Sequence, residues 1–209
     1  MAKMEKDLYK PRKTPTQDRA ITTFNAILDA AARLLTTKGY SYASTNRIAE
    51  VAGVSIGSLY EYFPGKEAIF CAIRMRTGRD LFKPRTQQII DSRNLSLSEL
   101  IRNLIEETIE SIMTYPELEA AIQSEVPAYI LKEQTKQLFD QMTVVTRVYF
   151  ENHLDEIRPH DFDTAIWLGL RVPVITITHA LLNEPELLRE KVFAEELIDM
   201  MSRFWLKDT

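Results

Sequence analysis

Cysteine is nearly absent from this sequence, because Cys71 is the one cysteine among 209 residues. No intrachain disulfide can form, so a disulfide-stapled scaffold is excluded. Cys71 continues the apolar rhythm of Ala68, Ile69, Ala72 and Ile73. We therefore expect a buried structural thiol rather than a redox sensor.

Long apolar runs are also missing. We find no run of about 18 apolar residues, so the sequence predicts no membrane span. The N-terminus is basic and polar and lacks the apolar core of a secretory signal. We expect a soluble, cytoplasmic protein with no membrane partner.

Signatures of catalysis are equally scarce. There is no G-x-S-x-G, no phosphate-binding glycine-rich loop and no cysteine nucleophile in a recognisable setting. His160 with Asp161 and Asp163 is a loose metal-like cluster that lacks the spacing of a zinc site, and residues capping the next helix explain it better. We predict no enzyme, no catalytic residue, no metal and no cofactor.

Charge is unevenly distributed behind a net value of -4. Residues 1–85 carry +7 (15 Lys+Arg against 8 Asp+Glu), and residues 86–209 carry -11 (11 against 22). A basic first part joined to an acidic remainder suggests that only the first part meets a polyanion. The alternative is ordinary variation in surface charge.

Apolar residues at helical spacing, with no convincing strand pattern, predict an all-α fold. In the first part we predict four helices: one from Asp18 to a stop at Gly39, a short one starting near Ser44 or Thr45, another from the cap Ser55 to Pro64, and one from Lys66 to Pro84.

The remainder reads as longer helices. A capping box of Ser96 and Glu99 opens one that continues to Tyr115. Further helices are expected to open at Pro116, at Pro127 (reaching Ile157) and at Pro185, and an almost wholly apolar helix, kinked at Pro173, is expected to end at Asn183.

The two short helices carry small residues and tyrosines that core packing does not explain. Gly53 supplies the turn between them, and Leu59 and Phe63 point inward, while Tyr60 and Tyr62 are expected to point outward. Two such helices match a helix-turn-helix, whose second helix lies in the DNA major groove.

The stretch from Thr45 to Phe70, TNRIAEVAGVSIGSLYEYFPGKEAIF, closely resembles the DNA-binding signature of the TetR family of bacterial transcriptional regulators, roughly T-x-x-I-A-x-x-A-G-V-S-x-G-T/S-L-Y-x-Y-F-x-x-K-E. The resemblance implies a homodimer that binds a palindromic DNA operator and is released by a small molecule. Residues 1–17 contain two prolines, five Lys/Arg and little to bury, so we expect a flexible basic arm. With the resemblance, we expect a three-helix helix-turn-helix DNA-binding domain (18–65) and a C-terminal helical ligand-binding and dimerisation domain (66–209).

Carried over to this sequence, the resemblance assigns DNA contacts to Thr45, Asn46, Arg47, Ser55, Ile56, Gly57, Ser58, Tyr60, Glu61, Tyr62 and Lys66. Ile56 could instead join the core; otherwise it could contact a thymine methyl group. In the arm, Lys10, Arg12 and Lys13 could reach a minor groove, or the arm could be a solubilising tail.

The acidic half offers candidates for a ligand pocket and a dimer seam. Pocket candidates are Met113, Tyr129, Met142, Tyr149, Trp167 and Arg171, although each apolar one could instead be part of the core. The charged Arg171 needs a partner, which could be a ligand carboxylate, an acidic residue of the same chain or a group across the seam. The resemblance places the seam on the last two helices, with Phe193, Met200 and Phe204 as candidates.

A different class of function is a helical protein-interaction adaptor whose helix-turn-helix packs against protein instead of DNA. The +7 charge of the first 85 residues argues against it.

Overall fold

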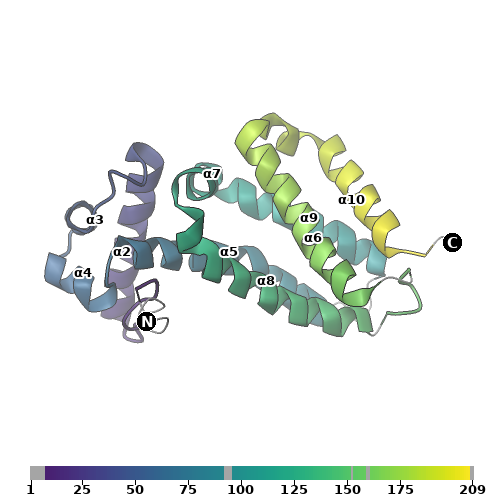
Figure 1. Cartoon of the computed structure of the whole chain (residues 1–209), viewed down its shortest axis with the longest axis horizontal. Coiled ribbons are helices and arrows are strands. Elements are labelled where there is room, and N and C mark those ends of the chain that lie inside the picture. The colour runs from purple at the N-terminus through teal and green to yellow at the C-terminus, as the bar shows by residue number, and fades with distance from the viewer. Residues whose placement is uncertain (1–7, 92–95, 152, 159–160, 208–209) are drawn as a thin grey trace. The chain divides into compact units, whose positions relative to one another are not determined.

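The computed structural model describes residues 8–91, 96–151, 153–158 and 161–207. It describes the side chains of all these residues except 80–91. Every regular element in these ranges is helical, apart from an isolated bridge between Ile157 and Leu206 (Figure 1). The predicted all-α fold is confirmed.

The chain divides into two compact units. Unit 1 comprises residues 1–77 and 117–136, and unit 2 comprises residues 78–116 and 137–209. Two long helices, α5 (Lys66–Asp91) and α8 (Ala128–Glu151), contribute residues to both units. The domain boundaries expected from the sequence stay a prediction.

Unit 1 is built around α2 (Asp18–Lys38), which packs against α3 (Thr45–Ala52) and α4 (Ile56–Tyr62). Most of α7 (Pro116–Glu125) also belongs to this unit. Its core is continuous and includes these fully buried large side chains: Ile27, Leu35, Ile48, Leu59, Phe63, Phe70, Ile122 and Ile130. This core fixes the two short helices, which are too brief to be stable alone.

A buried ion pair joins α5 to α7 within unit 1. The Arg74 guanidinium donates to Glu119 Oε1 at 2.9 Å, and both side chains are almost fully buried. Gln123 donates to the same carboxylate oxygen at 3.2 Å. A charge pair held this far from water depends on both partners being present.

Unit 2 contains α6 (Leu97–Thr114), α9 (Phe162–Asn183), a 3₁₀ turn η1 (Pro185–Arg189) and α10 (Lys191–Trp205). The predicted capping box is present, since Ser96 accepts from the Glu99 amide and the Glu99 carboxylate accepts from the Ser96 amide. α6 packs against α9 and α10. The Arg102 guanidinium in α6 makes two hydrogen bonds to Glu195 in α10, at 3.0 and 2.9 Å.

Three expected helix boundaries were wrong. α5 continues through Pro84 to Asp91, because a proline removes a single backbone donor from a long helix and its flanks keep the remaining bonds. α8 ends at Glu151, before Ile157, which instead pairs with the end of α10. The segment from Pro185 first forms η1, and the final helix starts at Lys191.

The expectation about membrane spans also needs a correction. Among the described residues α9 is long and apolar enough, by length and composition, to cross a membrane. A core helix of a soluble protein passes the same test, and α9 packs against α6 and η1. Because only 33% of the most apolar 18-residue stretch of α9 is buried, the helix keeps an exposed apolar face.

Candidate nucleic-acid interface and ligand cavity

The turn between α3 and α4 is fixed by local capping. The Ser44 hydroxyl accepts from the Arg47 amide and so caps α3. Gly53 ends α3 in the left-handed region (φ 67°), where a side chain would be strained. The Ser55 hydroxyl then accepts from the Ser58 amide at 3.0 Å and caps α4. These caps fix where α3 ends and α4 begins, and both helices pack beside α2 (Figure 1).

The inner face of α4 is larger than the sequence suggested. Leu59 and Phe63 are fully buried, as expected. Tyr62 is also buried, at 7% exposure, because its ring meets the Phe24 ring edge-on at 5.8 Å between centroids. The expectation that Tyr62 faces outward was wrong, since it lies three residues after Leu59 on the same face of the helix.

The outer face of α4 is open to solvent. Gly57 and Glu61 are exposed, and Tyr60 is 40% exposed. Ile56 is 39% exposed, which removes the core alternative for this residue. Ser58 is half-buried, and its hydroxyl lies 2.8 Å from the Ser55 hydroxyl. α4 thus presents small, aromatic and acidic groups together on its outer side.

Other predicted contact residues lie at the start of α3. The hydroxyls of Thr45 and Tyr60 are 3.2 Å apart, so the two short helices bring these groups together. Asn46 is exposed. Arg47 is exposed as well, and its guanidinium stacks on the Tyr42 ring at 4.0 Å and donates to the Tyr42 carbonyl.

Lys66, at the start of α5, is turned toward the protein. Its ammonium donates to the Tyr40 carbonyl at 3.1 Å and lies 4.0 Å from the centroid of the Tyr40 ring. Burial raises the pKa of the Tyr40 hydroxyl, with Glu67 adding to the effect, so the ring stays neutral beneath the ammonium. Lys66 would have to leave this position to contact a phosphate directly.

The described part of the basic arm lies against unit 1. The Arg12 amide donates to the Tyr62 carbonyl at 2.7 Å. The Lys13 ammonium pairs with the Glu61 carboxylate at 2.9 Å, and this hydrogen bond raises the pKa of Lys13. Gln134 donates to the Tyr9 carbonyl at 3.4 Å. Lys13 therefore places a positive charge beside the one acidic side chain of α4.

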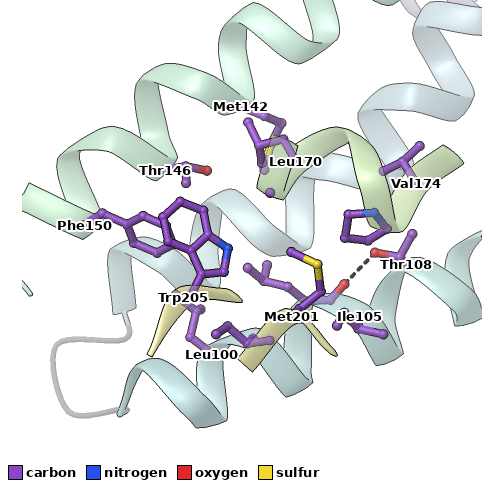
Figure 2. A pocket seen from close by; sticks show the side chains of 14 residues that line it. Leu100, Ile105, Thr108, Met142, Thr146, Phe150, Leu170, Val174, Met201 and Trp205 are labelled. Carbon is purple, nitrogen blue, oxygen red and sulfur yellow. Dashed lines mark hydrogen bonds between the residues drawn. The ribbon is translucent and has the colours of Figure 1, made fainter. Parts of the chain in front are cut away.

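Unit 2 contains a partly open cavity of about 60 Å³. Its walls come from α6, α8, α9 and α10 and are nearly all apolar. The lining residues are Leu100, Ile101, Leu104, Ile105, Thr108, Met142, Thr146, Phe150, Gly169, Leu170, Pro173, Val174, Met201 and Trp205 (Figure 2). We refer to this space as the unit 2 cavity.

Trp205 occupies one wall of the unit 2 cavity in close packing. Its ring meets Phe150 edge-on with centroids 4.3 Å apart. A Cβ atom on Gly169 would come within 2.4 Å of the indole, so only glycine lets α9 approach the ring this closely. The end of α10 is held by the Arg158 amide, which donates to the Trp205 carbonyl at 2.9 Å.

The predicted pocket residues are dispersed. Met142 lines the unit 2 cavity. Tyr149 is buried but stacks on His153 outside the lining, and Met113 is half-buried outside it too. Tyr129 and Trp167 are 70% and 53% exposed. The assignment of these residues to a ligand stays a prediction. Sequence reasoning did not single out the two threonines that line the cavity, Thr108 and Thr146.

Arg171 is half-buried and has partners that were not foreseen. Its guanidinium lies 4.5 Å from the Phe139 ring centroid and 4.6 Å from that of Trp167, and it donates to the Trp167 carbonyl. Desolvation lowers the pKa of Arg171, an effect that nearby Asp140 opposes. Aromatic faces thus hold the charge, and Arg171 does not line the unit 2 cavity.

The candidates for the dimer seam differ in exposure. Met200 is 46% exposed, and Phe193 and Phe204 are half-buried. Three more large apolar side chains, which sequence reasoning did not single out, are exposed on α9 and α10: Ile175, Leu182 and Val192. Trp167 of α9, named above as a pocket candidate, is exposed as well. Their assignment to a seam stays a prediction.

Cys71 and Asp161 have structural roles. Cys71 is 1% exposed, its thiol donates to the Ile130 carbonyl, and burial raises its pKa to about 12, as suits a structural thiol. Asp161 caps α9 by accepting from the Thr164 amide, which lowers the pKa of Asp161. Asp163 pairs with Arg147, and His160 lies outside the described residues.

Known proteins share both parts of this chain. Residues 27–73 match the family described as bacterial regulatory proteins, tetR family, and residues 96–204 match the tetracyclin repressor-like C-terminal domain. These matches cover the helix-turn-helix and most of unit 2. The chain therefore belongs to the TetR family of bacterial regulatory proteins.

Individual relatives are more distant. The A-factor receptor protein of Streptomyces griseus is 44% identical over 57 residues, which span 27% of this chain and 21% of that protein. NalD, the secondary repressor of the MexAB-OprM multidrug efflux pump in Pseudomonas aeruginosa, has a similar fold (TM-score 0.74, 20% identity, 91% of this chain and 99% of NalD). A TetR family transcription regulator from Marinobacter aquaeolei VT8 is also similar (TM-score 0.67, 19% identity, 92% and 100%).

Proposed function

We propose that this protein is a transcriptional repressor that binds a palindromic DNA operator as a homodimer and leaves it when a small molecule enters unit 2. The proposal includes a cytoplasmic location and no enzymatic activity. The observation that carries it is the two-sided character of α4, which buries Leu59, Tyr62 and Phe63 and exposes Ile56, Gly57, Tyr60 and Glu61.

The outer face of α4 suits a DNA groove. Gly57 is exposed and carries no side chain, so the start of the helix can approach base edges closely. Ile56 can contact a thymine methyl group, and the Ser58 hydroxyl can bond a base edge or a phosphate. Tyr62, which is buried, is better suited to holding α4 in place than to touching DNA.

The paired hydroxyls of Thr45 and Tyr60 suit a phosphate. They lie 3.2 Å apart, close enough to bind neighbouring oxygens of one phosphate group. The backbone amides at the start of α3 point in the direction that favours an anion. Arg47, exposed beside them, adds a positive charge.

A dimer follows from the number of base contacts and from the exposed apolar surface. One seven-residue helix reads too few base pairs for useful specificity, so two copies are required. α9 and α10 carry the apolar side chains Trp167, Ile175, Val192 and Met200 at 46–67% exposure. Apolar surface of this kind is typical of an interface between protein chains.

The test is a substitution that adds one methyl group to α4. In Gly57→Ala the new Cβ meets no atom closer than 3.7 Å, so the fold tolerates it. If α4 lies in the groove, the methyl group weakens binding to a selected operator duplex, measured by fluorescence polarisation. Ser98→Thr adds a methyl group at an exposed position of α6 and serves as the matched control.

Equal operator affinity for Gly57→Ala, Ser98→Thr and the unchanged protein would contradict the placement of α4. The adaptor alternative is tested separately with random-sequence duplex DNA. A repressor of this design binds it with an affinity that falls steeply as salt rises, whereas an adaptor shows no such dependence.

A further inference from the structure

We propose that the unit 2 cavity binds an uncharged, mostly apolar small molecule, and that the Thr146 hydroxyl forms a hydrogen bond with its one oxygen-bearing group. The inference rests on the proposed function in naming this molecule as the effector. Binding itself can be measured without DNA, so the two claims can fail separately.

The lining sets the charge of the ligand. None of the side chains that line the cavity is ionisable. Only Thr108, Thr146 and the Trp205 indole among them can form strong hydrogen bonds. A carboxylate or ammonium group moved from water to such walls would lose its hydration without gaining a partner. Arg171, for which a ligand carboxylate was one of the expected partners, is outside the lining and lies against two aromatic rings.

Thr146 sets the position of the polar group. Threonines inside helices commonly donate to the carbonyl four residues earlier, as Thr143 does to Phe139 in α8 and as Thr108 does to Leu104 across the cavity. The Thr146 hydroxyl is buried and has no hydrogen-bond partner among the described residues. A buried hydroxyl left in this state is costly, and a ligand oxygen would satisfy it.

The size of the cavity sets how the ligand enters. About 60 Å³ is well below the roughly 300 Å³ of ordinary ligand pockets, so some side chains must move. Met142 and Met201 line opposite parts of the wall in Figure 2, and methionine adapts its shape easily. A flexible, narrow chain with one terminal oxygen fits these requirements better than a large rigid ring system.

The experiment compares two probes of the same chain length, octan-1-ol and octanoate, at pH 7.5. The protein has two tryptophans, and Trp167→Phe removes the exposed one, so that the fluorescence of Trp205 reports on the cavity. We expect saturable quenching by octan-1-ol and at least about tenfold weaker binding of octanoate.

Thr146→Val tests the hydrogen bond by replacing the hydroxyl with a methyl group of similar size. It should weaken octan-1-ol binding by about three- to tenfold without lowering the melting temperature, because it removes an unpaired buried group. The matched control is Thr143→Val, one turn earlier in α8 and outside the lining, which should bind octan-1-ol like the unchanged protein.

Several results would overturn the assignment: no saturable binding of octan-1-ol, octanoate binding of equal strength, or Thr146→Val binding octan-1-ol as tightly as Thr143→Val does. If octan-1-ol binds as expected and operator affinity does not change, release by this ligand class fails while the cavity assignment stands. If octanoate alone releases the operator, the assignment fails while ligand-controlled repression stands.

Discussion

Removing one partner of the buried ion pair between Arg74 and Glu119 should destabilise the protein more than most single substitutions. The two charges lie 2.9 Å apart with side chains 6% and 11% exposed. At an effective dielectric constant of about 20, their attraction is roughly 6 kcal/mol, which offsets the cost of desolvating both. Glu119→Ala leaves the guanidinium buried without its counter-charge, and we expect a loss of about 3–5 kcal/mol of unfolding free energy.

The assay is urea denaturation followed by helical circular dichroism, at one fixed protein concentration because the proposed dimerisation would make the apparent stability depend on concentration. The double variant Arg74→Met/Glu119→Leu removes both charges and should stay within about 1.5 kcal/mol of the unchanged protein. Arg189→Ala, which removes an exposed pair with Glu186, should cost less than about 1 kcal/mol. A loss below about 1 kcal/mol for Glu119→Ala would refute the reasoning.

Three other substitutions change local geometry or a single charge pair. Gly53→Ala should lower the unfolding free energy, measured in a thermal melt, by about 1–2 kcal/mol. The added Cβ would meet no other atom, but alanine is strained in the left-handed backbone conformation of this turn. No loss of stability would show that the turn can change its conformation at no cost. Hydrogen bonds from Ser96 lower the pKa of Glu99, so the stability that this carboxylate contributes is present above its ordinary pKa and is lost as the pH falls. Ser96→Ala should therefore make the melting temperature depend less on pH in the acid range. An unchanged pH profile in this variant would count against the capping box. Lys13→Gln should weaken operator binding by leaving Glu61 unpaired beside the DNA, and Lys13→Gln/Glu61→Gln should recover part of the loss in the same polarisation assay.

Local signals account for the part of the fold that the sequence predicted best. The caps Ser44, Ser55 and Ser96 act on amides within three residues, and Gly53 turns the chain by its own conformation, so no distant contact is needed to recognise them. The assignments of Ser55, Ser96 and Gly53 are confirmed in the structure, and of the two caps considered for α3, Ser44 and Thr45, the structure has Ser44.

The misplaced residues depend on contacts between distant segments. Tyr62 is buried because Phe24 of α2 covers its ring, and α5 persists through Pro84 because one missing donor does not end a long helix. The partners of Arg171 come from α8 as well as from its own helix.

The unit 2 cavity was the least predictable feature. Four helices contribute to it, and a periodic apolar stripe does not reveal whether its residues meet other side chains or surround a space. Thr146 carried a partial signal as a polar residue among apolar neighbours, but its lack of a partner becomes visible only in the folded chain.

The most direct test of the account is selection of duplexes from a random DNA library by the purified, full-length protein at low salt. The account predicts recovery of a palindromic sequence that the unchanged protein binds more tightly than Gly57→Ala does. Recovery of no preferred sequence, or of one that both proteins bind equally well, would contradict the claim that the outer face of α4 reads DNA.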